Sequence, residues 1–211
     1  TQVKDSEKPF FVYLCTNAPH GPMHAPEASS KPYQDQSVNL ANFYGMIANI
    51  DDNVGAMRAF LKKEGLAENT IFIFTTDNGT SSGAQIHNNG MRGQKGSEYD
   101  GSHRVPFFIH WPKGGLNGGR DVDTITSYVD VVPTLINYCQ VPSPKGVKFD
   151  GVNIRPLVEG KAKNWKDRIL VTDSQRVRDP IKWRKSAVMT DQWRLVNGKE
   201  LYDINADPGQ K

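Results

Sequence analysis

The sequence predicts an α/β protein with a largely parallel sheet and flanking helices, followed by a small antiparallel sheet. Apolar runs without a break, which are typical of strands buried on both faces, occur at residues 9–16 and 71–74, and a further predicted strand lies at 105–112. A long helical pattern separates the first two runs, and a shorter one follows the third. The end of the chain instead contains short alternating segments, which are typical of antiparallel strands.

The first two strands and the helix between them follow directly from the pattern of apolar residues. PFFVYLCT at 9–16 is expected to be a buried strand that ends in a loop containing Pro and His. From Ser37 to Glu64 apolar residues recur every three or four positions, which predicts one long helix. Ser37 is its predicted N-cap and Gly65 its predicted stop. IFIF at 71–74 is expected to be the second strand.

The third strand and the second helix come after a long Gly-rich loop that runs from Asp77 to Arg104. VPFFIHWP at 105–112 is expected to be a strand, and TSYVDVVPTLINYC at 126–139 a helix. This order of strands and helices implies right-handed crossovers and hence a largely parallel sheet.

A change of character near residue 165 divides the chain in two. Residues 1–164 hold the predicted α/β elements. Residues 165–211 contain RILVTD, SAVMTDQWRLVNG and KELYDI, joined by turn residues such as Asn197-Gly198. We predict that this second part is a small antiparallel subdomain.

Composition and charge exclude several classes of partner. The chain is 37% hydrophobic and 23% charged, which is ordinary for a globular protein, and its net charge of +3 does not favour nucleic acid. No apolar stretch approaches the roughly 20 residues that span a bilayer, so no membrane partner is expected. We expect Cys15 and Cys139 to be buried apolar side chains.

Polar side chains that could bind a ligand or take part in catalysis follow or precede the predicted strands. Asp77 and Asn78 end the second strand, where ligands bind in open α/β sheets, and could bind a cation or cap a turn. Lys95 lies between glycines, which allow close approach to an oxyanion, although a solvated loop lysine fits as well. His20 follows the first strand, as a catalytic or a surface histidine.

These features occur together, with APHGP after the first strand, TTDNG at the end of the second and GQKGSEYDGSHRVP before the third. Together with NIDDNVGAMRAFLKKEGLAENTIFIFTTDNG, DVVPTL, DGVNIRPL and ELYDINADP, they resemble the carboxyl-terminal part of a type I sulfatase. This is the arylsulfatase-like branch of the alkaline phosphatase superfamily. The resemblance covers nearly the whole chain and implies an alkaline-phosphatase-like fold. It also implies hydrolysis of sulfate esters on a small molecule or carbohydrate.

The resemblance also assigns roles to individual residues. Asp77 and Asn78 would be two ligands of a calcium ion, since carboxylate and amide oxygens are the hard donors that calcium takes. His20 and Lys95 would be catalytic and contact the sulfate oxygens, with His20 protonating or holding the leaving oxygen. Arg104 is predicted to bind the substrate with them. A divalent cation, an ammonium and an imidazolium would all stabilise the charge that develops.

Two alternatives remain open. Phosphoesterases of the same superfamily tend to carry Asp-His-Gly at this strand end with zinc or manganese. Asn78 favours calcium and sulfate esters, because an amide oxygen does not select for those metals. The other alternative is a non-catalytic module that keeps the fold and a weak cation site.

The nucleophile of the family is absent from the chain. It is a formylglycine made from a Cys/Ser-x-Pro-x-Arg motif, but Cys15 reads CTNAP and Ser30 reads SKPYQ, with Gln34 in place of arginine. We therefore expect a chain without the first half of the enzyme, inactive alone, with an incomplete calcium site. Its uncovered sheet edge is expected to favour self-association. The resemblance implies a periplasmic, secreted or lysosomal-like location for the whole protein.

A basic segment at 175–185, QRVRDPIKWRK, surrounds Trp183 with cationic side chains. It could bind an anionic sulfated sugar through charge and stacking, or be a solvated edge of the small sheet. The basic residues are Arg176, Arg178, Lys182, Arg184 and Lys185.

Overall fold

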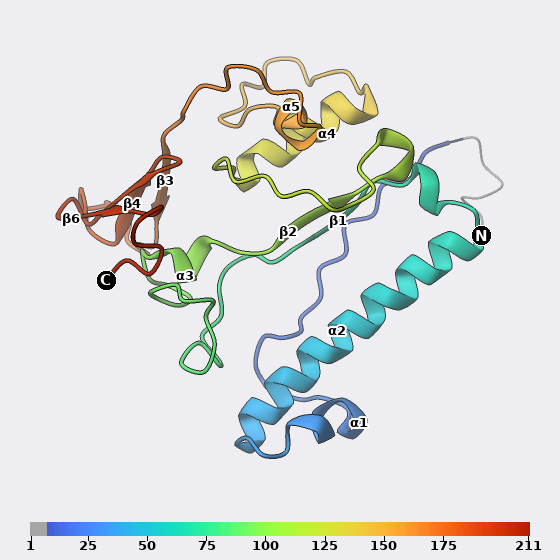
Figure 1. Ribbon diagram of the computed structural model, residues 1–211, viewed down its shortest axis with the longest axis horizontal. Helices are drawn as coiled ribbons and strands as arrows, with labels where there is room; N and C mark the ends of the chain where they lie inside the picture. The colour runs from blue at the N-terminus through green and yellow to red at the C-terminus, as the bar shows by residue number, and fades with distance from the viewer. Residues whose placement is uncertain (1–7) are drawn as a thin grey trace. The chain divides into compact units, whose positions relative to one another are not determined.

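The computed structural model describes residues 8–211 (Figure 1). The chain forms two compact units. Among the described residues, the first unit contains 8–72, Ser81–His87 and His110–Gly114, and the second contains Ile73–Thr80, Asn88–Ile109 and Gly115–Lys211. No helix within residues 8–211 combines the length and apolar composition that crossing a bilayer requires.

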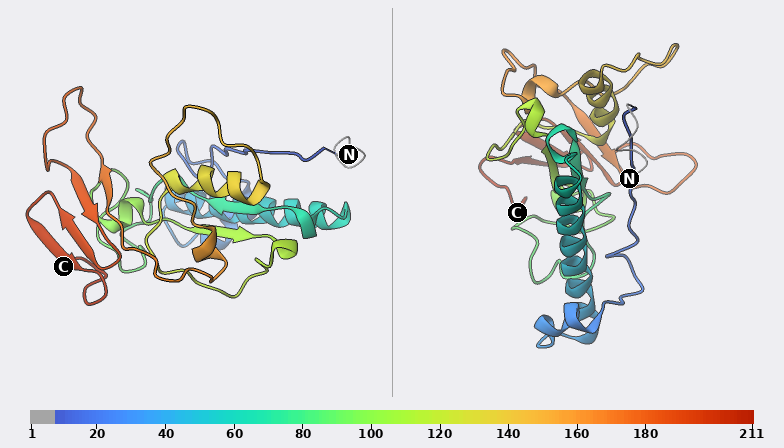
Figure 2. Two further views of the ribbon diagram at one scale, coloured as in Figure 1. Left: turned by 90° about the horizontal axis from the view of Figure 1, so that it is seen from above. Right: turned by 90° about the vertical axis from the view of Figure 1, so that its right-hand side faces the viewer.

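The first unit is built on α2, Val38–Lys63, as the helical pattern predicts. Ser37 precedes it in an extended conformation, and Gly65, at φ +71°, ends it in the left-handed region that glycine tolerates. Figure 2 shows the short helix α1, Glu27–Ser30, packed at the beginning of α2. Gly45 allows this contact, because a Cβ atom there would lie 2.9 Å from the Ser30 backbone. Short 3₁₀ helices complete the unit at Lys31–Tyr33, Ala67–Asn69 and Pro112–Gly114.

The first predicted strand, at residues 9–16, is wrong. This segment lies outside both sheets, and its side chains from Phe10 to Leu14 are 39% to 83% exposed. An apolar run becomes a strand only when a neighbouring strand satisfies its backbone groups, and composition does not supply that neighbour. The burial expected for the cysteines is wrong too, since Cys15 and Cys139 are both exposed.

The predicted largely parallel sheet is also wrong. β1, Phe72–Thr75, and β2, Phe107–His110, form a two-stranded sheet in which the chain folds back on itself. Thr75 Oγ1 donates to the Pro106 carbonyl at 2.9 Å, so the end of β1 lies beside the start of β2. A parallel pair needs a long crossover, usually a helix. The connection here contains only the four-residue helix α3, Asp100–His103, and the strands run antiparallel.

The small antiparallel sheet at the end of the chain is present as predicted. Its strands pair in the order β3-β4-β5-β6, with Val188 of β4 opposite Val171 and Leu195. The sheet packs its apolar face around Ala187, Met189 and Val196. The strands are Leu170–Asp173, Ser186–Met189, Trp193–Val196 and Glu200–Asp203.

Asp130, which is fully buried, lies at the start of the next helix of the second unit. It ends the 3₁₀ turn Tyr128–Asp130 and directly precedes α4, Val131–Cys139. Its carboxylate accepts hydrogen bonds from the Ser127 and Val152 amides and forms an ion pair with Arg168 at 2.8 Å. Burying this charge is tolerated because each oxygen has a partner. The short helix α5, Arg155–Val158, packs against α4.

Candidate active site

Asp77 and Asn78 lie in the turn directly after β1. Gly79 follows them, and its amide donates to the Ser102 carbonyl at 2.7 Å. A Cβ atom at Gly79 would lie 2.0 Å from the Gly101 carbonyl oxygen, so this approach requires glycine. The turn that carries the two polar side chains is thereby fixed against α3.

The two side chains lie against each other. Asn78 Nδ2 donates to Asp77 Oδ2, with Asp77 exposed and Asn78 half-buried. A half-turn of the Asn78 side-chain amide would exchange its nitrogen for its oxygen and place two oxygens side by side. One cation could contact both. By donor type, this pair fits calcium.

The number of donors is smaller than a complete site requires. Calcium takes six to eight oxygens, whereas Asp77 and Asn78 supply two. Within residues 8–211 no group of three or more His, Cys, Asp or Glu side chains is arranged to hold a metal. The pair therefore fits one part of a calcium site.

A backbone hydrogen bond of Lys95 places this residue next to the Asp77–Asn78 turn. Its amide donates to the Thr80 carbonyl at 3.0 Å, two residues after Asn78. Gly93 and Gly96 flank it at φ +83° and +85°, conformations that side chains rarely adopt. The structure therefore places the Asp77–Asn78 turn and the backbone of Lys95 side by side.

Arg104 and His103 lie at the end of the same loop. Arg104 is exposed, and its amide donates to the Asp100 carbonyl at 2.8 Å. Burial lowers the pKa of His103, although the nearby Asp100 opposes this shift. His103 is therefore held neutral near pH 7.

His20 belongs to the first unit and is exposed. Its amide donates to the Asn17 carbonyl at 2.9 Å, and Nδ1 lies 2.9 Å from the Gly21 carbonyl. These local contacts form a turn that presents the imidazole. That His20 joins the residues of the second unit stays a prediction.

The loop that carries Lys95 is held by residues that the sequence did not point to. Asp100 is 1% exposed, and its Oδ1 accepts from Arg194 Nε of β5 at 3.0 Å. Its amide donates to Gln210 Oε1 at 2.9 Å, and Gln210 is also fully buried. α3 is thereby tied to β5 and to the last residues of the chain.

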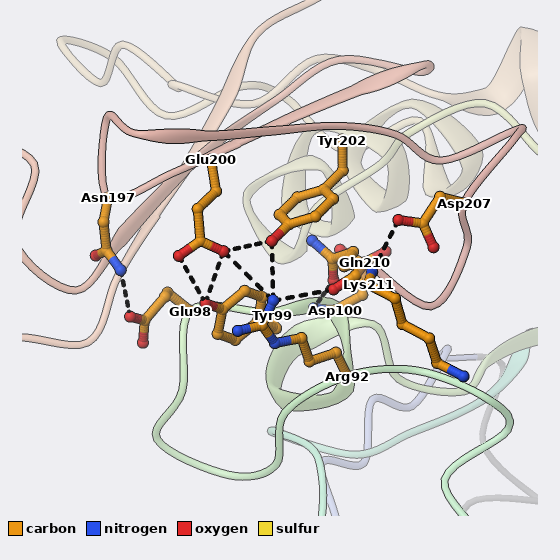
Figure 3. A network of polar contacts seen from close by, with 10 residues as sticks. All are labelled: Arg92, Glu98, Tyr99, Asp100, Asn197, Glu200, Tyr202, Asp207, Gln210 and Lys211. Carbon is orange, nitrogen blue, oxygen red and sulfur yellow. Dashed lines mark hydrogen bonds and ion pairs between the residues drawn. The ribbon is translucent and has the colours of Figure 1, made fainter.

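A second set of contacts ties the loop to the same C-terminal sheet (Figure 3). Arg92 donates to Tyr202 Oη at 2.8 Å and to the Gln210 carbonyl at 3.0 Å, and its guanidinium lies 4.0 Å from the Tyr99 ring centre. Tyr99 donates to Glu200 at 3.0 Å. The only sequence signal for this set was the alternation in KELYDI, which puts Glu200 and Tyr202 on one face of β6.

These contacts also set the charge of Glu200. The hydrogen bond from Tyr202 lowers the pKa of the Glu200 carboxyl, and those from Tyr99 and Arg92 act in the same direction. Burial raises the pKa of Tyr99, and its bond to Glu200 adds to that rise. Near neutral pH the set therefore pairs an ionised Glu200 with protonated tyrosines and Arg92.

Comparisons with known proteins identify the family of the chain. Residues 1–141 match the family model described as Sulfatase, and residues 94–211 match the model described as N-sulphoglucosamine sulphohydrolase, C-terminal. The chain is 34% identical over 163 residues to the uncharacterized sulfatase YdeN of Escherichia coli. It is 29% identical over 245 residues to an arylsulfatase of Clostridium perfringens. The chain belongs to the sulfatase family.

The matches cover most of this chain and a smaller share of each relative. The chain covers 29% of YdeN and 49% of the Clostridium arylsulfatase. In a solved structure of Ps i-CgsB in complex with k-i-k-neocarrahexaose, 47% of that chain aligns with all of this one. The TM-score is 0.86 at 27% identity. The chain therefore spans about half the length of these relatives or less.

Proposed function

We propose that the whole protein is a sulfuric ester hydrolase that acts on a sulfated carbohydrate. The observation that carries this proposal is the alignment of the entire chain with Ps i-CgsB, which was solved with a neocarrahexaose. A likeness to the human N-acetylgalactosamine-6-sulfatase, 28% identical over 158 residues, also favours a sugar substrate. A periplasmic, secreted or lysosomal-like location remains part of the proposal.

The proposed cofactors are a calcium ion and a formylglycine. Calcium would be held in part by Asp77 and Asn78. The two groups would supply neutralising charge and the nucleophile, respectively. The donor pair favours this metal over zinc, since an amide oxygen is a hard ligand. The other calcium ligands and the formylglycine lie outside this chain under the proposal.

The residues of this chain would bind the sulfate group and stabilise charge. Negative charge grows on the oxygens of the ester as the bond from sulfur to the leaving oxygen breaks. Lys95 would oppose that charge from a backbone fixed beside the Asp77–Asn78 turn. His20 would donate a proton to the leaving oxygen, and Arg104 would bind the sulfated substrate.

The test compares ester hydrolysis by the full-length protein and its variants, with calcium present. Lys95→Ala is expected to lower kcat for an aryl sulfate about 10²- to 10³-fold, as loss of one charge-stabilising group typically does. Lys145→Ala is the matched control, because Lys145 is an exposed lysine that also precedes a glycine. It is expected to leave kcat unchanged.

The same assay separates the alternatives. Faster hydrolysis of an aryl phosphate than of the aryl sulfate would support the phosphoesterase. A full-length protein that turns over neither ester and carries no Cys/Ser-x-Pro-x-Arg motif would support the non-catalytic module. Equal kcat for wild type and Lys95→Ala would remove Lys95 from the catalytic residues.

A further inference from the structure

The loop that joins β3 to β4, residues 174–185, accounts for the net positive charge of the chain. It carries five basic residues and one acid, Asp179, whereas the whole chain carries 26 basic and 23 acidic residues. The rest of the chain therefore has one more acid than base. Within residues 8–211 the ion pairs involve other side chains, and all five basic residues of the loop are exposed.

The Gln175 side chain bridges the backbone of this loop. Gln175 Nε2 donates to the Ile181 carbonyl at 3.1 Å, and the backbone amide of Ile181 donates to Gln175 Oε1 at 3.0 Å. At its base, the Ser174 amide donates to the Lys185 carbonyl at 3.0 Å. Cations on a fixed backbone lose less freedom when a ligand binds than cations on a mobile segment.

Trp183 adds an aromatic surface to the cations. It adopts φ +67° and packs on the β5–β6 turn, because a Cβ atom at Gly198 would lie 2.7 Å from the indole ring. It is nevertheless 42% exposed, and Lys182 Nζ lies 5.3 Å from its ring centre. A held, half-exposed indole beside unpaired cations offers both stacking and charge to one ligand.

We propose that residues 174–185 form a binding surface for a polysaccharide that carries several sulfate groups. The inference rests on the proposed function and adds a subsite outside the residues assigned to catalysis. Arginines such as Arg176 and Arg178 can hold sulfates with paired hydrogen bonds. Trp183 would stack on a sugar ring. A nucleic acid offers charge and stacking too, but the likeness to a carbohydrate-bound relative favours the glycan.

The experiment measures binding of the full-length protein to dextran sulfate, with uncharged dextran and double-stranded DNA as comparison ligands. The test variant is Arg176→Gln/Arg178→Gln. The control is Lys62→Gln/Lys63→Gln, which removes the same charge from exposed residues of α2. The loop variant is expected to raise Kd for dextran sulfate about five-fold, because each exposed ion pair contributes modestly. The control is expected to stay within two-fold of wild type.

Enzyme kinetics separate this surface from the catalytic site. The loop variant is expected to keep wild-type kcat and KM for a small aryl sulfate and to raise KM for a sulfated polysaccharide. Equal weakening by the loop variant and the control would overturn the proposal, because net charge alone would explain binding. Tighter binding to DNA than to dextran sulfate would overturn it in favour of a nucleic acid. Binding to dextran sulfate is measurable even if no sulfate ester is hydrolysed, so the two proposals fail separately.

Discussion

Replacing Arg194 with methionine is expected to loosen the loop that carries Lys95. Asp100 would keep a carboxylate that is 1% exposed but lose its ion pair with Arg194 at 3.0 Å. Breaking a buried pair by removing one partner costs about 3–5 kcal/mol. Arg194 also donates to the carbonyls of Thr190 and Trp193, and the variant loses these bonds too. The stabilising free energy lost in Arg194→Met should therefore lie toward the upper end of that range.

The assay is hydrogen exchange of the full-length protein, read by mass spectrometry on peptides from residues 92–103 and β5. Even the lower end of that range, about 3 kcal/mol, corresponds to opening that is about 10²-fold more frequent, so an increase of at least that size is expected. Peptides from α2 are an internal reference, and Arg178→Met is the matched control at an exposed arginine. The kcat for an aryl sulfate should fall with the loss of protection.

A double variant tests whether the unpaired charge is the cause. Asp100→Leu/Arg194→Met removes both charges, and apolar replacement of a buried pair is often close to neutral. We expect the double variant to recover most of the protection that Arg194→Met loses. Wild-type exchange in Arg194→Met, or a double variant as labile as the single one, would contradict a role for the Asp100–Arg194 ion pair in holding the loop.

Three further predictions concern pH, metal and the isolated chain. Burial lowers the pKa of His103 below about 6.5, its value in the unfolded chain, so the unfolded state binds a proton first as the pH falls. The free energy of unfolding should therefore fall as the pH drops below about 6.5. In acid titrations, His103→Gln should remove that part of the pH dependence. Asp77→Ala in the full-length protein should weaken calcium binding by calorimetry at least ten-fold, and unchanged affinity would contradict its role as a ligand. The 211-residue chain alone should not hydrolyse an aryl sulfate, and it should self-associate in ultracentrifugation through the exposed apolar segment at 10–14. Turnover by the isolated chain would show that it contains a nucleophile.

Local pattern predicted the elements whose stability is local. α2 could be placed from the spacing of its apolar residues together with Ser37 and Gly65, because a helix satisfies its own backbone. The strands β3–β6 could be placed from alternation and tight turns, since each pairs with its neighbour in the chain. Family membership could also be predicted from short segments such as APHGP and TTDNG taken together, and the family matches confirm it.

Long-range pairing could not be read from the same patterns. The segment at 9–16 and the strand β1 have similar composition, yet only β1 is paired in a sheet. The antiparallel direction of β1 and β2 depends on how the connection between them folds, which apolar runs do not specify. The ties from Asp100 and Arg92 to the C-terminal sheet join residues about 100 positions apart, and neither residue type signals its partner.

The contacts between the Lys95 loop and the C-terminal sheet have a consequence for chimaeras between family members. Arg92 and Tyr99 meet Glu200 and Tyr202, which are encoded far downstream in the sequence. A graft that exchanges only the C-terminal strands would pair Arg92 and Tyr99 with side chains from another family member. A crossover that carries residues 92–103 with the donor sheet would keep the matched pairs, so viable recombinants should inherit both segments from one parent.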